Sequence, residues 1–250
     1  MDIPMHVVIT GASRRIGLGL AEMFVKEGHQ VSMQVRSQPD EFLTFRNNHH
    51  TKTHHVACDL LEDHALENLY GRLCEKFGPA DLLINNASNF EPDSAEDFDA
   101  DQLASHIRVN LEASITLARD MSIDQGLNQG ASIINIVDQR VDRLTPKFFT
   151  YTLAKSALRT ATITMAQQFA PNIRVNAIGP GPTMVNKRQA SEDFAAQVDA
   201  LPLKRAISVE DLFATACFLS ENPCITGQII HVDSGQHLAW ETPDVLNANE

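Results

Sequence analysis

The sequence predicts an α/β fold with one doubly wound, seven-stranded parallel sheet and helices on both of its faces. Short apolar runs alternate with longer segments of helical period, the pattern expected when crossover helices connect parallel strands. The seventh strand candidate ends near residue 232, and no linker rich in Pro, Ser or Gly divides the chain. We therefore expect a single domain over residues 1–240 and a polar tail over residues 241–250.

The strand candidates are short apolar runs bounded by turn residues. They cover residues 5–10, 30–35, 54–58, 81–85, 132–137, 173–177 and 228–232. Between the first two runs, apolar residues recur at helical spacing from Leu18 to Val25, and Gly28 is placed to end this helix. The same spacing predicts helices over residues 65–76, 103–121, 149–170 and 209–219.

Composition limits the partners of the chain. Its 250 residues carry a formal net charge of −12, and an acidic surface repels nucleic acid and anionic membranes. No apolar run approaches the ~20 residues of a membrane span, and the N-terminus lacks the basic region of a signal peptide. The four cysteines are scattered, without CxxC spacing. We expect reduced thiols, a cytoplasmic location and a small-molecule partner.

The turn after the first strand has the form of a phosphate-binding turn. It reads Thr10-Gly11-Ala12-Ser13-Arg14-Arg15-Ile16-Gly17 and lies between a strand and a helix. Such a turn presents backbone N–H groups and the positive end of the helix to a pyrophosphate. Gly11 would allow the backbone to turn, and Gly17 would allow the helix to pack closely. We therefore expect a dinucleotide here.

Two arginines stand at the start of the following helix, where cations are unfavourable because of the helix macrodipole. Arg15 occupies the place where dinucleotide-binding turns usually have their middle glycine. A long cation at that position can reach phosphate groups that backbone amides cannot. The alternative is a solvated helix start. We favour a phosphate role for Arg15, and for Arg14 both alternatives stay open.

The end of the second strand indicates which dinucleotide is bound. NAD-specific sites place an acidic residue there, about 20 residues beyond the glycine turn, to accept hydrogen bonds from the ribose 2′-hydroxyl. Here the strand ends in Arg36 and Ser37, and the first acid is Asp40. A cation and a hydroxyl suit a 2′-phosphate. The sequence therefore predicts NADPH as the cofactor.

A tyrosine and a lysine four residues apart are candidates for proton transfer. Tyr151 and Lys155 lie on one face of the helix predicted over residues 149–170. A phenol is a poor acid at neutral pH, and an adjacent cation stabilises the phenolate, so we expect Lys155 to lower the pKa of Tyr151. Lys155 could also hydrogen-bond the nicotinamide ribose. We expect a reductase in which Tyr151 supplies the proton that accompanies hydride transfer.

Taken together, these motifs resemble the short-chain dehydrogenase/reductase family. The resemblance extends from about residue 5 to residue 240. It rests on Thr10-Gly11…Gly17, Asn85-Asn86-Ala87, Asn110, Tyr151…Lys155 and Pro180-Gly181. It implies a Rossmann sheet of seven strands, hydride transfer from a nicotinamide and a homotetramer. It also implies that Asp59 contacts adenine, that Asn110 holds a helix and a proton-relay water, and that Thr183 approaches the nicotinamide amide.

Three departures from the usual family pattern narrow the resemblance. Most members have serine at the position of Asp138 and glycine at the positions of Arg15 and Ser88. The three substitutions resemble the pteridine reductase and dihydromonapterin reductase branch. In that branch the fourth strand ends in an Asn-Asn-Ala-Ser motif, here Asn85–Ser88, and an aromatic residue shortly after it stacks on the pterin. Phe90 stands in that position. The alternative for Phe90 is an ordinary core residue.

The chemistry of Asp138 favours the same branch. Serine donates a hydrogen bond to a ketone oxygen, whereas an ionised aspartate is an acceptor only. Asp138 would therefore destabilise the alkoxide that develops when a ketone is reduced. A pterin offers an N–H/NH₂ edge and a C=N bond, and Asp138 could work with Tyr151 to relay a proton to the ring nitrogen. The alternative for Asp138 is a surface acid paired with Arg140 or Arg143.

The sequence thus predicts an NADPH-dependent reductase of dihydropterins, such as dihydromonapterin or dihydrobiopterin, with dihydrofolate as a further candidate. The alternatives are a general carbonyl or quinone reductase and a catalytically silent NADPH-binding protein. The histidines within residues 47–55 have no carboxylate or cysteine at the spacing of a zinc site, so we predict no metal.

Three sets of site residues follow from the motifs and the resemblance. The expected catalytic residues are Tyr151, Lys155, Asp138 and Asn110. The expected substrate-binding residues are Arg15, Ser88, Phe90, Asp138 and Tyr151. The expected cofactor-binding residues are Gly11, Arg14, Arg15, Ile16, Gly17, Arg36, Ser37, Asp59, Leu60, Asn86, Ala87, Ser88, Tyr151, Lys155, Pro180, Gly181 and Thr183.

Overall fold

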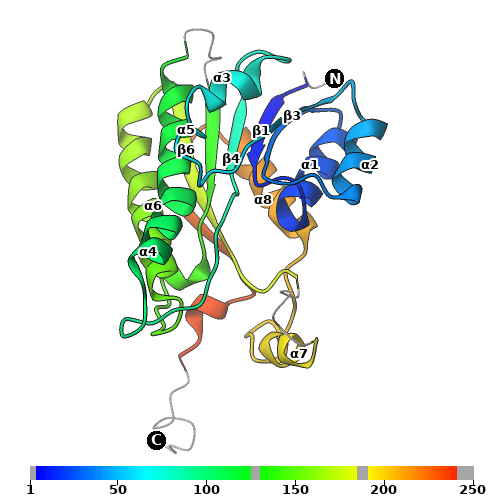
Figure 1. Ribbon diagram of the computed structural model, residues 1–250. Coiled ribbons are helices and arrows are strands. Elements are labelled where there is room, and N and C mark those ends of the chain that lie inside the picture. Colours follow the sequence, from blue (N-terminus) through cyan, green and yellow to red (C-terminus); the bar gives the residue numbers. More distant parts are fainter. Residues whose placement is uncertain (1–3, 125–129, 185–190, 241–250) are drawn as a thin grey trace, which may run out of the picture.

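The computed structural model describes residues 4–124, 130–184 and 191–240 and contains one sheet of seven strands (Figure 1). The strand order is β3-β2-β1-β4-β5-β6-β7, and every neighbouring pair is parallel. This arrangement is the doubly wound α/β fold that the sequence predicts. The predicted tail over residues 241–250 lies outside the described residues.

The strands correspond to the apolar runs of the sequence. Their bounds are β1 His6–Thr10, β2 Gln30–Val35, β3 Thr53–Ala57, β4 Leu82–Asn85, β5 Ala131–Ile136, β6 Ile173–Pro180 and β7 Ile229–Val232. Most ends lie within one residue of the prediction. The prediction that the sixth strand ends at residue 177 is wrong, because Gly179 pairs with His231 and Pro180 pairs with Val232.

Helices cover both faces of the sheet (Figure 1). One face carries α1 Arg15–Lys26, α2 Asp40–Asn48 and α8 Val209–Glu221, and the other carries α3 Leu69–Cys74, α5 Ala113–Ser122 and α6 Phe149–Phe169. Successive residues of a strand face opposite ways. Val7 and Ile9 therefore pack in the cluster with α1 and α8, while Val8 packs in the cluster with α3 and α5.

Two helices were not predicted, and both bury few apolar residues. Helix α2 is polar except for Phe42 and Phe45, which are its buried residues. Helix α7, Ser191–Asp199, stands apart from both helical layers in Figure 1. A helix without a long apolar stripe leaves no periodic signal in the sequence. No helix in the described part of the chain is long and apolar enough to cross a membrane.

The helix predicted over residues 103–121 is interrupted. Helix α4, Ala100–Ile107, leads into a π-helical turn, Arg108–Glu112, which leads into α5. The turn contains Asn110, whose side chain is fully buried. Single π-helical turns inside helices often occur at functional sites, and apolar spacing does not reveal them.

The strand order reverses between β1 and β4, which places a crevice at their carboxyl ends. Side chains fix these ends to each other. The Thr10 hydroxyl oxygen accepts hydrogen bonds from the backbone N–H groups of Asn86 and Ala87, each at 3.0 Å. Asn86 Nδ2 donates to the Thr10 carbonyl oxygen at 2.9 Å. The crevice is therefore held in shape by contacts that also position the residues after β4.

Buried polar side chains join β4, β5 and α6. Asn85 Nδ2 donates to Asn135 Oδ1 at 2.9 Å, and Asn135 Nδ2 donates to Thr162 Oγ1 at 2.9 Å. All three side chains are almost inaccessible to solvent. Buried amides require partners because water is not available to replace them. This chain of bonds ties the centre of the sheet to the helix that carries Tyr151.

We predict that substitution N135L destabilises the protein. The leucine leaves the buried Asn85 amide with the Ser114 carbonyl oxygen at 3.3 Å as its remaining partner. We expect the free energy of unfolding to fall by about 1–3 kcal/mol, measured by chemical denaturation. The control is S132A on the same strand, because the buried Ser132 hydroxyl has no hydrogen-bond partner among the described residues. Equal stability of N135L and S132A would contradict the prediction.

Candidate active site

A cavity of about 1130 Å³ opens at the carboxyl ends of the strands, around the β1–β4 crevice. All the site residues named from the sequence, which lie in the described part of the chain, line this cavity, with the exception of Asn110. The lining residues that were predicted are Gly11, Arg14, Arg15, Ile16, Gly17, Arg36, Ser37, Asp59, Leu60, Asn86, Ala87, Ser88, Phe90, Asp138, Tyr151, Lys155, Pro180, Gly181 and Thr183.

The turn after β1 leaves no room for side chains at its two glycines. Gly11 has a left-handed backbone (φ 66°), and a Cβ atom there would lie 2.7 Å from Ala87 Cα. A Cβ atom on Gly17 would collide with the Gly11 carbonyl oxygen. Gln34 supports this turn, because its Oε1 accepts from Gly11 N at 2.9 Å. Sequence analysis missed Gln34 because a single glutamine in an apolar strand carries no motif.

Arg15 has an unusual backbone for an arginine. Its φ of 54° lies in the left-handed region that favours glycine. For residues that carry a Cβ atom, including arginine, the left-handed conformation costs about 1–2 kcal/mol of conformational free energy. Its Nη2 donates to the Met184 carbonyl oxygen at 3.3 Å, which connects the turn with the segment after β6. An arginine held in a glycine conformation indicates a role for its side chain.

Residues that follow β2 and β3 also line the cavity. Arg36 and Ser37 are exposed at the rim, and Asp59 and Leu60 line the same cavity. Arg14 also lines it. These arginines supply local positive charge in a chain whose net charge is −12. An anionic ligand such as a phosphorylated ribose therefore has favourable electrostatics here.

Asp138, Arg140 and Tyr151 form a hydrogen-bonded group in the cavity wall. The Tyr151 hydroxyl donates to Asp138 Oδ2 at 3.0 Å. Arg140 Nη1 donates to both carboxylate oxygens of Asp138 at 3.2 Å. Arg143 is not the partner, since its Nη1 donates to the Gln236 carbonyl oxygen at 3.0 Å. Asp138 is therefore paired with Arg140, as one alternative expected, but it is a largely buried residue rather than a surface acid and it also bonds Tyr151.

Burial decides the protonation of the tyrosine and the lysine. Burial, followed by the charge of Asp138, raises the pKa of Tyr151 well above its ordinary value. Burial lowers the pKa of Lys155 to about 8, against the opposite effect of Asp138. Lys155 Nζ donates to the Ile136 carbonyl oxygen at 2.7 Å and lies 5.9 Å from the centroid of the Tyr151 ring. The expected net lowering of the Tyr151 pKa is therefore not found, because burial and Asp138 outweigh the nearby cations, and Tyr151 is a neutral phenol.

Phe90 belongs to an aromatic wall beside Tyr151. Its ring stacks on Phe148 with 4.3 Å between centroids and 9° between planes. Its edge contact with the Tyr151 ring has a centroid distance of 4.7 Å. Both phenylalanines line the cavity, so Phe90 is not an ordinary core residue. Phe148 was missed because it precedes α6 with a left-handed backbone (φ 58°), outside any periodic pattern.

Asn110 acts on the loop after β4. Its Nδ2 donates to the Asn89 carbonyl oxygen at 2.9 Å, and its Oδ1 accepts from Asn89 N at 3.0 Å. Asn89 stands between Ser88 and Phe90, so these bonds fix the loop that carries both side chains. Asn110 was expected among the catalytic residues, but it does not line the cavity. Its side-chain amide instead bonds the backbone of Asn89.

A buried network anchors the same loop to the start of α6. Glu91 N donates to His106 Nε2 at 3.2 Å, and His106 Nδ1 lies 2.7 Å from Thr150 Oγ1. The Thr150 hydroxyl donates to Asp93 Oδ2. Because Nε2 accepts, the neutral imidazole carries its proton on Nδ1. Burial lowers the pKa of His106 and favours this neutral form. The network holds Phe90 next to Phe148 and Tyr151.

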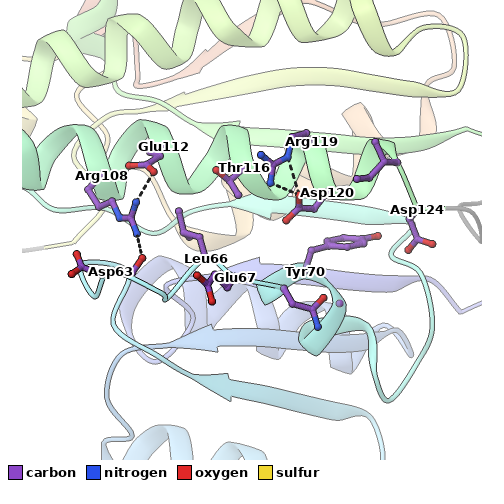
Figure 2. Close-up of a pocket in the computed structure, with 13 residues that line it drawn as sticks. Asp63, Leu66, Glu67, Tyr70, Arg108, Glu112, Thr116, Arg119, Asp120 and Asp124 are labelled. Carbon is purple, nitrogen blue, oxygen red and sulfur yellow. Dashed lines mark hydrogen bonds and ion pairs between the residues drawn. The ribbon is translucent and has the colours of Figure 1, made fainter.

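A second hollow, of about 700 Å³, lies between α3 and α5 (Figure 2). Two pairs of its charged side chains bond each other, Arg108 with Glu112 at 2.5 Å and Arg119 with Asp120 at 2.7 Å. Arg108 Nη2 also donates to the Asp63 carbonyl oxygen at 3.0 Å. None of the site residues named from the sequence, all within the described ranges, lines this hollow. The candidate chemistry therefore lies in the cavity at the strand ends.

One group of possible metal ligands occurs in the described part of the chain. Donor atoms of His231, Asp233 and His237 lie within 4.8 Å of one another. The two imidazoles stack at 4.2 Å with 25° between their planes, and His237 Nδ1 lies 2.8 Å from Asp233 Oδ2. A ring nitrogen binds a metal in the plane of its ring, so nearly parallel rings do not converge on one ion. We interpret this group as a hydrogen-bonded turn after β7.

Comparisons with known proteins match most of the chain to oxidoreductases. A family model described as enoyl-(acyl carrier protein) reductase matches residues 11–237. The chain is 29% identical over 244 residues to glucose and ribitol dehydrogenase homolog 2 of Arabidopsis thaliana, with 91% of this chain and 84% of the relative covered. It is 28% identical over 250 residues to D-beta-hydroxybutyrate dehydrogenase of Rhizobium meliloti, with 91% and 96% covered.

Two solved structures of another protein give higher identity. FolM alternative dihydrofolate reductase 1 from Brucella canis, complexed with NADP, is 41% identical with a TM-score of 0.90, covering 96% of this chain and 97% of that chain. The protein of the same name from Brucella suis, also in complex with NADP, is 41% identical with a TM-score of 0.90, covering 97% and 98%. A short-chain dehydrogenase/reductase from Serratia marcescens, 24% identical with a TM-score of 0.84, shares the fold over 92% of this chain and 97% of its own.

We predict that R15G weakens NADPH binding without lowering the stability of the protein. Glycine relieves the left-handed backbone but gains entropy in the unfolded chain, so the free energy of unfolding should stay equal or rise by up to ~1 kcal/mol. The lost cation should weaken binding of NADPH about tenfold, followed by fluorescence titration. The control is R14G, because Arg14 has an extended backbone (φ −165°) and glycine brings no relief there. If R15G is less stable than R14G, the role given to the left-handed backbone is incorrect.

We predict that His106 makes stability depend on pH. Its pKa is lowered below the ordinary value of 6.5 in the folded protein, so the unfolded chain binds the proton more readily. The stabilisation is fully present above pH 6.5 and is lost as the pH falls through the lowered folded pKa. The free energy of unfolding of H106Q, measured between about pH 5 and about pH 7, should change less with pH than that of the wild type. The exposed His50 provides the control H50Q, whose slope should equal the wild-type slope.

Proposed function

The chain belongs to the short-chain dehydrogenase/reductase family, and on that premise we propose that it is an NADPH-dependent reductase of dihydropterins. In this proposal NADPH supplies the hydride and Tyr151 supplies the proton that goes to the ring nitrogen. The two Brucella proteins, named alternative dihydrofolate reductases and bound to NADP, support both the cofactor and the substrate class. Dihydromonapterin, dihydrobiopterin and dihydrofolate share the ring that the site would bind.

The observation that carries the proposal is the hydrogen bond between Tyr151 and Asp138 at 3.0 Å. A carboxylate next to the proton donor suits a substrate that offers N–H donors, because a carboxylate accepts hydrogen bonds and does not donate them. A ketone offers no such donor and develops negative charge on its oxygen during reduction. The position of Asp138 therefore favours reduction of a C=N bond over reduction of a ketone.

The residues of the turn after β1 fit the pyrophosphate of NADPH. Gly11 and Gly17 let the turn pack closely on the residues after β4, and the turn lines the cavity, where its backbone could contact phosphate. Arg36 and Ser37 line the cavity where the 2′-phosphate would lie, and Asp59 would contact the adenine. The nicotinamide end would lie between Thr183 and Lys155.

Tyr151 and its neighbours would hold and deliver the proton. The raised pKa of Tyr151 keeps the phenol protonated until a substrate nitrogen accepts the proton. The O–H bond breaks, an N–H bond forms, and the oxygen keeps the electron pair. Lys155 and Arg140 then stabilise the phenolate electrostatically, since both cations lie beside Tyr151. Asn110 is a positioning residue, because it holds the loop of Ser88 and Phe90.

The aromatic wall would orient the planar ring. Phe90 lines the cavity beside Tyr151, and stacking of an aromatic side chain on a pterin ring contributes about 0.5–1.5 kcal/mol beyond the area that it buries. Ser88 and Arg15 line the same cavity and would supply polar contacts. A general carbonyl or quinone reductase is the second candidate function, favoured by the dehydrogenase relatives.

One assay separates these functions. NADPH oxidation is followed with dihydropterins, dihydrofolate, quinones and simple ketones in parallel, and each reaction is repeated with NADH. We expect turnover with the dihydropterins and a higher kcat/KM with NADPH than with NADH. Turnover confined to ketones and quinones would establish the second candidate. Tight NADPH binding without turnover of any substrate would indicate a binding protein.

We predict that Y151F removes the proton donor and leaves cofactor binding intact. The phenylalanine keeps the ring contacts with Phe90 but lacks the hydroxyl that bonds Asp138. General acid catalysis contributes about 10²–10⁴-fold, so kcat with a dihydropterin should fall by at least about 10². The dissociation constant for NADPH should stay within about twofold of the wild-type value. Retained turnover in Y151F would show that another group supplies the proton.

A further inference from the structure

We propose that Arg140 is a positioning residue of the reaction, which acts by holding the Asp138 carboxylate against the Tyr151 hydroxyl. The proposal rests on the proposed function, since it concerns the same proton donor. Arg140 lines the cavity but carries no family motif and was considered from the sequence only as a possible surface partner of Asp138. The structure places it between Asp138 and the aromatic wall.

The hydrogen bonds of Asp138 are dominated by Arg140. The carboxylate accepts four hydrogen bonds, and three come from Arg140: the backbone N–H to Oδ1 at 2.8 Å and Nη1 to Oδ1 and Oδ2 at 3.2 Å. The fourth is the Tyr151 hydroxyl to Oδ2 at 3.0 Å. A carboxylate has about four lone-pair positions, so these bonds define its orientation. The backbone N–H of Arg140 therefore fixes Oδ1, and the Arg140 side chain, equally distant from both oxygens, holds the carboxylate with Oδ2 at the tyrosine.

The guanidinium of Arg140 is itself held in place. Its central carbon lies 5.5 Å from the centroid of the Phe90 ring and 5.1 Å from that of the Phe148 ring. These distances are within the range of cation–π attraction. Since Phe90 and Phe148 stack on each other, the aromatic wall supports the cation as one unit. The side chain is 21% exposed, so the charge pair with Asp138 is largely removed from water.

The contact has an electrostatic consequence at the proton donor. The charge of Asp138 raises the pKa of Tyr151, and the charge of Arg140 lowers it. Arg140 therefore compensates part of the cost of leaving a phenolate beside a carboxylate after the proton has moved. A neutral side chain at residue 140 would keep the backbone bond to Oδ1 but lose the side-chain contact with both oxygens and this compensation.

The test compares R140Q, R140K and a matched control. We expect R140Q to lower kcat about tenfold or more, because a charge-assisted contact in a partly buried site is lost, and to leave NADPH affinity unchanged. R140K should recover part of kcat, since lysine keeps the charge but lacks the planar fork of arginine. The control R143Q removes a neighbouring arginine that bonds the Gln236 carbonyl oxygen, and its kcat should equal that of the wild type.

A double-mutant cycle with D138N shows whether Arg140 acts through Asp138. If it does, R140Q lowers kcat much less in the D138N background than in the wild type. Independent effects that multiply would overturn the proposal, as would a wild-type kcat in R140Q. The unfolding midpoint of each variant, with NADPH affinity, identifies a loss of activity that comes from misfolding.

A crystal structure of R140Q tests the proposal without a substrate. The Asp138 carboxylate should leave its position at hydrogen-bond distance from the Tyr151 hydroxyl. An unchanged carboxylate overturns the positioning role even if dihydropterins are reduced. Failure of the proposed function looks different, because the wild type itself then leaves dihydropterins unreduced, and the kinetic cycle is measured on the carbonyl or quinone that it does reduce.

Discussion

The close approach of the turn after β1 to the end of β4 determines most of the site. Gly11 lies against Ala87 and Gly17 lies against the Gly11 carbonyl, so neither position can carry a side chain without a collision. The Thr10 hydroxyl then fixes the first residues after β4. The same few residues therefore shape the cavity beside the turn after β1 and set the starting point of the loop that carries Ser88 and Phe90.

Those parts of the fold that bury apolar surface on both sides were predictable from sequence. The strands are continuous apolar runs because helices cover both faces, and their ends fall close to the predicted positions. Helix α2 was not predictable by the same means, since it buries only Phe42 and Phe45. The π-helical turn at Asn110 was also missed, because one extra residue in a helical turn changes the apolar spacing too little to be read.

In the site, the residues of sequence motifs were predictable, whereas the residues that hold them in position were not. Tyr151 and Lys155 are recognisable by spacing, but the pKa of Tyr151 depends on burial and on Asp138, which spacing does not show. Gln34 and Phe148 act through contacts with residues far away in the chain, and such contacts leave no local pattern. The two sequence interpretations of Asp138 differed in its partner, Tyr151 or an arginine, and spacing could not show that the carboxylate contacts both Tyr151 and Arg140.

The residues that depart from the family pattern line the same cavity, and two of them share a physical property. Arg15 occupies a backbone conformation that suits glycine, and Asp138 sits in a largely buried position beside a phenol, an arrangement that raises the pKa of Tyr151. Neither feature improves the stability of the fold on its own. The compensating contacts, Arg15 to Met184 and Arg140 to Asp138, are themselves in the cavity wall. Features that are unfavourable for folding and supported by cavity residues are best explained by the ligands that the cavity binds.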